Sequence, residues 1–231
     1  MLPMKRIPAT RLNTLLAAAS ASEYADPSVH YPDWYLHRWH FLPDGYLTAR
    51  GAHQYDRFIR PLYHAASESR TQTLLSNIVV SLRPGSVFEI GCGPGRTLAQ
   101  LAAIPSVSLS GIDLSPFMLE LAADRAGDAV QLRQANATLL PFKAESFDLV
   151  LALHVLGHMP PLEATVAAAE AVRVLRPGGR LVTVEHSWHH LEWPDSLEHR
   201  RHRRVGRGFA RLRIHRRKLV AASEPRDTSE E

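Results

Sequence analysis

Residues 87–97 read Val-Phe-Glu-Ile-Gly-Cys-Gly-Pro-Gly-Arg-Thr, and this stretch decides how the rest of the chain is interpreted. It combines an apolar strand, a glycine-rich turn and the start of a helix, with Glu89 two positions before the first glycine. Because Gly91, Gly93 and Gly95 carry no side chain, backbone N–H groups of the turn can approach a ligand closely. The stretch therefore predicts a small-molecule site at the end of a strand.

The spacing of the glycines argues against a dinucleotide. The dinucleotide fingerprint is G-x-G-x-x-G, whereas this turn is G-x-G-x-G and Arg96 stands where the third glycine of the fingerprint would be. Glu89 would also repel a pyrophosphate, and it suits a ligand with an ammonium group and no phosphate. On this stretch alone, a tight strand-to-helix turn without a ligand stays open as the alternative.

The segments that follow predict a doubly wound α/β sheet. Residues 107–113 form a second apolar run that ends in Asp113, whose carboxylate can accept both ribose hydroxyls of a nucleoside. Ser115 is the expected N-cap of a helix from Phe117 to about Arg125. Further strands are predicted at residues 129–133, 147–153 and 180–185, and a helix at 162–175. Strands that alternate with helices at this spacing make a mainly parallel sheet covered on both faces.

From residue 87 to residue 185 the chain resembles the class I S-adenosylmethionine-dependent methyltransferases, specifically those of the type 11 group. The matching stretches are residues 89–95, 111–116, 140–142 with 146–148, and 174–179. The resemblance covers about 100 of the 231 residues. It implies a Rossmann-like methyltransferase fold and S-adenosylmethionine as the cofactor.

The resemblance also implies which residues bind the cofactor. Glu89 and the three glycines would surround its methionine portion, Asp113 would bind the ribose hydroxyls and Leu114 would pack on the adenine. The remaining implied contacts are Asn136 and Ala137 at the adenine edge and Leu153 at the reactive end. The commoner pattern has aspartate in place of Asn136, but an amide offers both a donor and an acceptor, so adenine can still be read.

Two histidines are candidates for a catalytic base. His154 and His158 follow the fourth predicted strand, and open α/β sheets place their sites at the carboxyl ends of strands. Histidine titrates near neutrality, and a base helps if the acceptor is a hydroxyl or a thiol. With 13 histidines in the chain, an incidental position for either one stays open.

Composition bounds the class of protein. The one cysteine, Cys92, excludes an internal disulfide and a cysteine-rich zinc site. Glu185 and the histidines at 186, 189 and 190 lack a specific ligand spacing, so no metal site is expected. No apolar run approaches 18 residues, so no spanning helix is expected. Residues 15–19 are too short an apolar stretch for a signal peptide, which favours an N-terminal helix and a cytoplasmic protein.

We divide the chain into a cap and lid segment at residues 1–80, a cofactor-binding core at 81–198 and a basic segment at 199–231. The first part is rich in aromatic residues, namely Tyr31, Trp34, Tyr35, Trp39, Phe41 and Tyr46. Residues 55–63 resemble the segment before the core in ubiquinone/menaquinone and related lipid methyltransferases, which implies closure over the cofactor. The rings could attract a sulfonium by cation–π interaction or simply pack the cap onto the sheet.

The basic segment carries an uneven share of the charge. The chain has a net charge of +4, yet residues 199–218 hold nine arginines, one lysine and no acidic residue. Such a segment can bind nucleic acid or an anionic membrane, or it can be a solvated tail. Residues 210–215 alternate in polarity and predict a strand at the sheet edge. Residues 224–231 are expected to be disordered, and the C-terminal part of the sheet to be short or atypical.

These observations predict a methyltransferase that transfers a methyl group from S-adenosylmethionine to a small, lipophilic or aromatic acceptor by in-line displacement. One alternative is a nucleic-acid or protein methyltransferase that docks through the basic segment, although residues 153–156 read Leu-His-Val-Leu rather than Asn-Pro-Pro-Tyr. Another is a cofactor-binding protein without activity. The sequence does not predict the oligomeric state.

Overall fold

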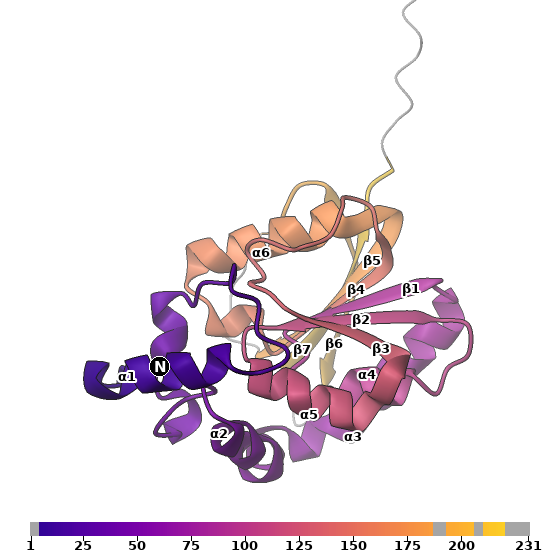
Figure 1. The fold of residues 1–231 in the computed structure, drawn as a ribbon. Helices are drawn as coiled ribbons and strands as arrows, with labels where there is room; N and C mark the ends of the chain where they lie inside the picture. The colour runs from indigo at the N-terminus through magenta and orange to yellow at the C-terminus, as the bar shows by residue number, and fades with distance from the viewer. Residues whose placement is uncertain (1–4, 187–192, 206–209, 220–231) are drawn as a thin grey trace, which may run out of the picture.

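The computed structural model describes residues 5–186, 193–205 and 210–219, which form a seven-stranded sheet flanked by helices (Figure 1). The strand order is β3-β2-β1-β4-β5-β7-β6. The strands are β1 (Ser86–Ile90), β2 (Ser108–Asp113), β3 (Val130–Gln134), β4 (Phe147–Leu153), β5 (Leu175–His186), β6 (Leu197–Val205) and β7 (Ala210–Arg217). Strands β1 to β5 pair in parallel, and β7 is antiparallel to both of its neighbours. The predicted doubly wound, mainly parallel sheet is confirmed.

Helices cover both faces of the sheet. The main ones are α3 (Arg60–Leu82), α4 (Arg96–Leu101), α5 (Pro116–Ala126) and α6 (Pro161–Val174). Figure 1 shows α6 above the sheet and α3, α4 and α5 below it. Alanines of α6 pack against Phe88 and Val150 on one face, whereas leucines of α3, α4 and α5 pack against Val87 and Leu149 on the other. Successive strand residues face opposite sides, so both layers of core come from the same apolar strands.

Local sequence signals explain where α4 and α5 begin. Ser115 caps α5, because its side chain accepts a hydrogen bond of 3.2 Å from the N–H of Met118, as predicted. Gly95 precedes α4 in a left-handed conformation (φ 72°). A Cβ on Gly95 would lie 2.6 Å from the Cβ of Ala122 in α5. Gly95 therefore lets the start of α4 approach α5 closely.

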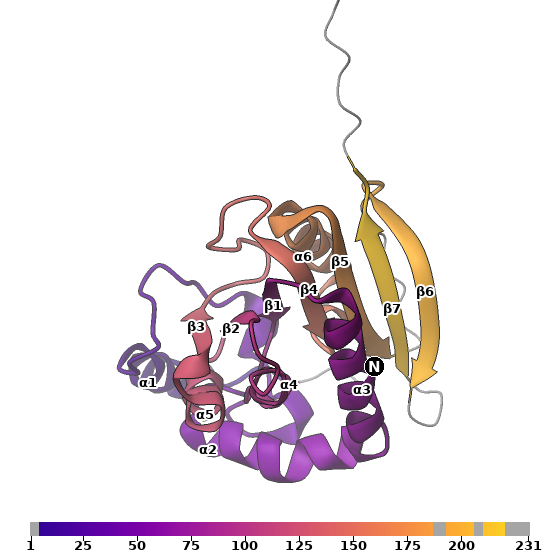
Figure 2. The same cartoon turned by 90° about the vertical axis from the view of Figure 1, so that its right-hand side faces the viewer.

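The C-terminal strands differ from the expectation of an edge strand in a short sheet. Residues 210–215 do form a strand, β7, but it lies between β5 and β6 (Figure 2). Ala210 and Leu212 belong to the buried core, and β6 pairs along the other side of β7. The edge placement was wrong because alternation shows only that one face of a strand is buried, not how many neighbours pair with it. Residues 224–231, predicted to be disordered, lie outside the described residues.

The N-terminal segment contributes α1 (Ala9–Ser20), α2 (Ala49–Gln54) and a π-helical turn, Tyr55–Ile59, that continues into α3. The described residues also contain four short 3-10 turns. Two lie in the N-terminal segment, at Asp33–Leu36 and Trp39–Phe41, and two lie later in the chain, at Gly127–Ala129 and Leu156–His158. Leu15, Leu36 and Leu47 form a small core with Leu114 of the loop after β2. Among the described residues, none of the helices has the length and apolar character that a membrane span requires. The boundaries at residues 80 and 198 stay a prediction.

Candidate functional site

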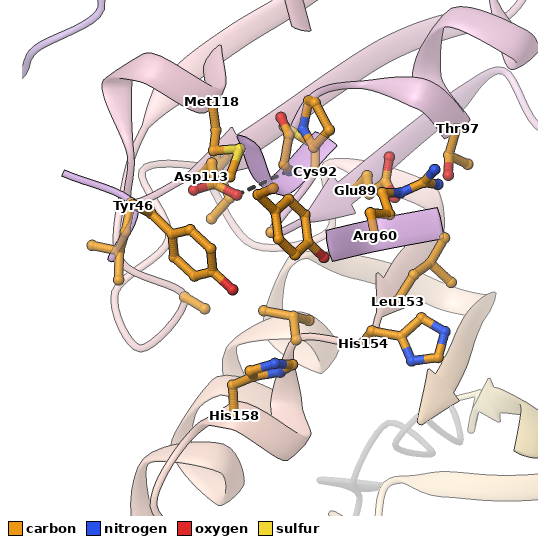
Figure 3. A pocket seen from close by; sticks show the side chains of 18 of the residues that line it. Tyr46, Arg60, Glu89, Cys92, Thr97, Asp113, Met118, Leu153, His154 and His158 are labelled. Atoms are coloured by element: carbon orange, nitrogen blue, oxygen red, sulfur yellow. Dashed lines mark hydrogen bonds between the residues drawn. The ribbon is translucent and has the colours of Figure 1, made fainter. Parts of the chain in front are cut away.

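A pocket opens where β1, β2 and β4 end, and it brings together most of the residues that the sequence singles out (Figure 3). The predicted residues that line it are Glu89, Gly91, Gly93, Asp113, Leu114, Ala137, Leu153, His154 and His158. Two predicted residues, Gly95 and Asn136, are not part of this lining. Parallel strands that end at one edge of the sheet explain why residues from three distant segments meet here.

Each of the three positions in the turn requires glycine for a different structural reason. Gly93 (φ 52°) faces open space, since a Cβ there would meet no atom within 4 Å. Gly91 (φ 64°) lies against the loop after β4, and its Cβ would be 2.5 Å from Cγ2 of Val155. Gly95 serves helix packing, as described above. All three have positive φ, which favours glycine, and only Gly93 leaves room for a ligand.

Glu89, at the end of β1, presents a buried carboxylate to the pocket. It is 2% exposed, and its Oε2 has no hydrogen-bond partner among the described residues. Burial raises the pKa of Glu89 to about 8, although a hydrogen bond with Thr97 and the charge of Arg60 lower it. Arg60 itself pairs with Glu68 at 2.5 Å. A buried acceptor without a donor fits a ligand that brings a cationic donor.

Asp113, at the end of β2, joins the glycine turn to α5. Its Oδ2 accepts the N–H of Gly93 and its Oδ1 accepts the N–H of Ser115, both at 2.9 Å. Burial raises the pKa of Asp113 to about 6 despite these donors. An ionised carboxylate has about four lone-pair sites, so two bonds leave capacity for a pair of ligand hydroxyls. The role at a ribose that the resemblance implied stays a prediction.

Asn136 is held in a turn of its own. Its Oδ1 accepts the N–H of Thr138 at 3.0 Å, and the residues that line the pocket here are its neighbours, Ala135 and Ala137. The structure therefore gives no pocket contact for the Asn136 amide. Leu114 and Met118 add apolar lining nearby. The sequence analysis did not single out Met118, because it looked for pocket residues at the ends of strands and Met118 lies inside α5.

The two candidate bases lie on the side of the pocket opposite Asp113 (Figure 3). His154 has a positive φ of 54°, directly after β4. His158 ends a short 3-10 turn, and its ring centroid is 5.0 Å from that of Trp39 and 5.7 Å from that of His40. The structure thus brings both imidazoles to the pocket. Neither is shown to act as a base.

Aromatic side chains of the N-terminal segment complete the wall. Those that line the pocket are Trp34, Tyr35, Trp39, Tyr46 and Tyr55. Tyr46 and Tyr55 meet edge to face at 5.3 Å, and burial raises the pKa of Tyr55 to about 12. The aromatic density of the sequence was the signal for this wall, because all of its rings except Tyr55 belong to the aromatic cluster of residues 31–46. Phe41 is 86% exposed and belongs to a different surface.

Asp56 ties this segment to the glycine turn. Its carboxylate accepts hydrogen bonds from Arg96 at 2.8 Å and from Arg125 at 2.7 Å. Arg125 also donates to the carbonyl of Pro94 inside the turn. Burial raises the pKa of Asp56, but the two guanidinium partners outweigh it and hold the pKa below its usual value. The N-terminal segment is thus fixed to both helices that flank the turn.

Residues 88–183 match the family of methyltransferase domains. This part of the chain is a class I methyltransferase domain. The match confirms the predicted family, and with it S-adenosylmethionine as the cofactor of this class. The residues of the pocket also fit this cofactor. The unpartnered Oε2 of Glu89 and the open space at Gly93 both lie in the matched part of the chain.

Curated relatives of this methyltransferase domain include other methyltransferases. The 27-O-demethylrifamycin SV methyltransferase of Amycolatopsis mediterranei (strain S699) is 38% identical over 125 residues, which cover 51% of this chain and 45% of that protein. The O-methyltransferase cnsE of Penicillium expansum is 36% identical over 120 residues, which cover 48% of this chain and 43% of that protein. The chain thus spans less than half the length of these relatives.

A solved structure supports the fold. The N-methyltransferase NodS from Bradyrhizobium japonicum WM9, in complex with S-adenosyl-L-homocysteine, superposes with a TM-score of 0.55 at 22% identity. The match covers 65% of this chain and 87% of that one. At this identity the likeness shows the shared Rossmann-like fold and nothing about the substrate.

Proposed function

We propose that this protein is an S-adenosylmethionine-dependent methyltransferase that acts on a small, lipophilic or aromatic acceptor. The observation that carries the proposal is the pair of carboxylates at the ends of β1 and β2, with open space at Gly93, which lines the same pocket. Glu89 suits an ammonium group at one end of a ligand, and Asp113 suits vicinal hydroxyls at the other.

The chain's own residues have little chemistry to do beyond binding and alignment. S-adenosylmethionine supplies a methyl group that is electrophilic because it is attached to a positively charged sulfur. Glu89 would hold the ammonium, Asp113 the ribose hydroxyls, and Leu114 would pack on the adenine. The aromatic wall and the Asp56 ion pairs would keep water out and hold the acceptor in line with the bond that breaks.

The acceptor side of the pocket supports the class of substrate. Its wall is formed by rings of Trp39, Tyr46 and Tyr55, which favour a flat or apolar acceptor. His154 and His158 are the candidates for removing a proton if the acceptor is a hydroxyl or a thiol. The relatives include an O-methyltransferase, which agrees with an oxygen acceptor.

A second candidate is a nucleic-acid or protein methyltransferase. The observation that favours it is the cluster of ten cationic residues between positions 199 and 218. A cofactor-binding protein without activity is a third candidate, because fold and cofactor together do not establish a reaction. The cytoplasmic location expected from the sequence stays a prediction.

Two measurements test the proposal. Calorimetry is expected to show binding of S-adenosylmethionine and S-adenosylhomocysteine and no binding of NAD. Incubation with tritiated S-adenosylmethionine and a panel of quinols, phenols, thiols, lipids and RNA is then expected to label a small apolar or aromatic acceptor. Binding of NAD without a response to S-adenosylhomocysteine would overturn the cofactor. Label that appears only in RNA would promote the second candidate.

A further inference from the structure

A second buried carboxylate lies at the same edge of the sheet, on β5. Glu185 is 1% exposed, and its side chain accepts hydrogen bonds from three consecutive backbone N–H groups. Oε1 accepts from Val155 at 3.0 Å and from Leu156 at 2.9 Å, and Oε2 accepts from Gly157 at 3.3 Å. Three N–H groups that converge on one anion form a concave backbone site of the kind that proteins use for bound anions, here filled by the protein's own side chain.

The loop held in this way forms the acceptor side of the pocket. It begins with His154, whose N–H donates to the carbonyl of Val184 at 2.7 Å, and it ends at His158. Val155 also packs against Gly91, so the loop touches the glycine turn on its other side. A movement of the Val155–Gly157 backbone would therefore displace both imidazoles relative to the cofactor turn.

The C-terminal hairpin supplies a positive charge to the same carboxylate. In the β5–β7 pairing Glu185 stands opposite Arg211 and Thr183 stands opposite Arg213. Opposed residues, and residues two apart on a strand, share a face of the sheet, so Arg213 is a diagonal neighbour of Glu185. Burial raises the pKa of Glu185 to about 7, whereas the three N–H donors and the charge of Arg213 lower it.

We propose that Glu185 is a positioning residue whose carboxylate fixes the loop that carries His154 and His158, with Arg213 of the C-terminal hairpin supporting its charge. This gives part of the basic segment a role inside the enzyme, separate from any anionic partner. The inference rests on the proposed function only for the statement that the loop faces the methyl acceptor. The carboxylate–loop contact itself can be tested without an acceptor.

The direct test is a pH titration of backbone amides by NMR spectroscopy on the full chain. In the wild type, the N–H signals of Val155, Leu156 and Gly157 are expected to shift together with one midpoint near pH 7, because protonation of Glu185 removes their acceptor. The charged groups that face this carboxylate or its loop are Arg213, Arg211, His154 and His158. In Glu185→Gln the shared transition is expected to disappear, whereas a transition caused by the histidines would remain.

Matched variants of β7 test the contribution of Arg213. Arg213→Gln is expected to raise the shared midpoint by about half a pH unit or more, because it removes a nearby positive charge. Arg216→Gln removes the same charge from the other end of the same strand, where Arg216 stands opposite Arg180, and is expected to leave the midpoint unchanged. These two variants also serve if Glu185→Gln does not fold. Equal shifts in both variants, or none in either, would overturn the role of Arg213.

Cofactor binding separates this inference from the proposed function. S-adenosylhomocysteine affinity is expected to change less than about threefold in Glu185→Gln, because Glu185 does not line the pocket. Exchange of the three loop amides with solvent is expected to accelerate at least about tenfold. A wild type in which the three amides do not titrate together would overturn the inference and leave the methyltransferase proposal standing. Loss of S-adenosylhomocysteine binding in the wild type would do the reverse.

Discussion

Two glutamates lie at the carboxyl edge of the sheet, Glu89 on β1 and Glu185 on β5. Both are buried, but they differ in the hydrogen bonds that their carboxylates accept. Glu89 leaves Oε2 without a donor, whereas both oxygens of Glu185 accept backbone N–H groups. They also face opposite sides of the sheet, since Glu89 meets Arg60 and Thr97 of the α3 and α4 layer while Glu185 holds the loop before α6. Residue type and burial alone would not separate them.

The difference teaches which carboxylate is prepared for a ligand. A buried acceptor without a partner costs about 1–3 kcal/mol, and more if it is charged, so a protein keeps one only where something else compensates. Glu89 keeps that cost in the ligand-free protein, and the proposed cationic donor of the cofactor would relieve it. Glu185 is relieved by the chain itself. The cofactor side of the pocket is thus incomplete without a ligand, and the loop on the acceptor side is complete.

The largest expected effect is the loss of cofactor affinity when the carboxylate of Glu89 is removed. Glu89→Ala removes the acceptor for the ammonium group, and hydrogen bonds to charged groups contribute about 1.5–3 kcal/mol, so we expect affinity for S-adenosylmethionine to fall about a hundredfold. In the wild type at pH 7, binding is expected to release a proton, because a group with a pKa of about 8 must ionise to meet a cation. Calorimetry in buffers of different ionisation enthalpy measures both quantities.

The pH dependence of thermal unfolding, with Glu89→Gln as the control, tests the protonation of Glu89 in the ligand-free protein. The folded pKa of about 8 lies above the ordinary glutamate pKa of 4.5, so between these values the folded ligand-free protein binds a proton that the unfolded chain has released. The stabilisation from this group is complete below about pH 4.5 and is lost as the pH rises to about 8. Thermal unfolding of the wild type relative to Glu89→Gln should follow this course. A constant difference across that range would show that Glu89 is ionised in the ligand-free protein.

The next effect concerns Asp113, which resembles Glu185 in accepting backbone N–H groups and Glu89 in its predicted role toward the cofactor. It already accepts the N–H groups of Gly93 and Ser115, and it is also the predicted ribose acceptor. Asp113→Asn keeps the size of the side chain but loses the charge and one acceptor. We expect about a tenfold loss of S-adenosylhomocysteine affinity, measured by calorimetry. Ser115→Ala, which removes the N-cap but no pocket group, is the control for damage to α5 alone. An unchanged affinity in Asp113→Asn would exclude the ribose role.

Much of this site could be predicted from the sequence, because the signals were local. Glycines, a terminal carboxylate and an N-cap serine each act within a few residues, so Glu89, Gly93 and Asp113 fell where the strand-turn-helix pattern placed them. The fold followed from the alternation of apolar strands and helices. Asn136 shows the limit, since its amide closes a turn onto Thr138 instead of lining the pocket.

The rest depended on contacts between distant segments. The Asp56 ion pairs join residues 40 and 69 positions apart, and Glu185 reaches a loop 28 to 30 residues earlier. No local pattern encodes such pairs. The position of β7 inside the sheet was mispredicted for the same reason. The alternation of polar and apolar residues indicated a strand, but it did not indicate which two strands pair with it. Residues 189 and 190, considered and rejected as metal ligands, lie outside the described residues.

A smaller effect concerns the ion pairs that fix the N-terminal segment. Asp56→Asn weakens the bonds to Arg96 and Arg125, and partly exposed pairs contribute up to about 1 kcal/mol each. We expect S-adenosylhomocysteine to dissociate about three- to tenfold faster, as measured by stopped-flow fluorescence. Asp33→Asn is the control, because the Arg6–Asp33 pair is exposed and joins two residues of the N-terminal segment to each other. Equal rates in the two variants would mean that the Asp56 contacts do not retain the ligand.

The smallest expected effect concerns the basic segment, and it contrasts Arg213 of β7 with the arginines of β6. We expect neutralisation of Arg200, Arg201, Arg203 and Arg204 to change S-adenosylhomocysteine affinity and small-molecule methylation less than about twofold, since β6 is separated from the pocket by β7 and β5. Nucleic-acid binding by the wild type should be weak at physiological salt and should fall by about one log unit per log unit of salt for each phosphate contact. Fluorescence anisotropy with labelled RNA and DNA at several salt concentrations measures this slope. Tight binding that survives physiological salt, lost in the fourfold variant together with methyl transfer into RNA, would show that these arginines dock a nucleic-acid substrate and would replace the small-molecule proposal.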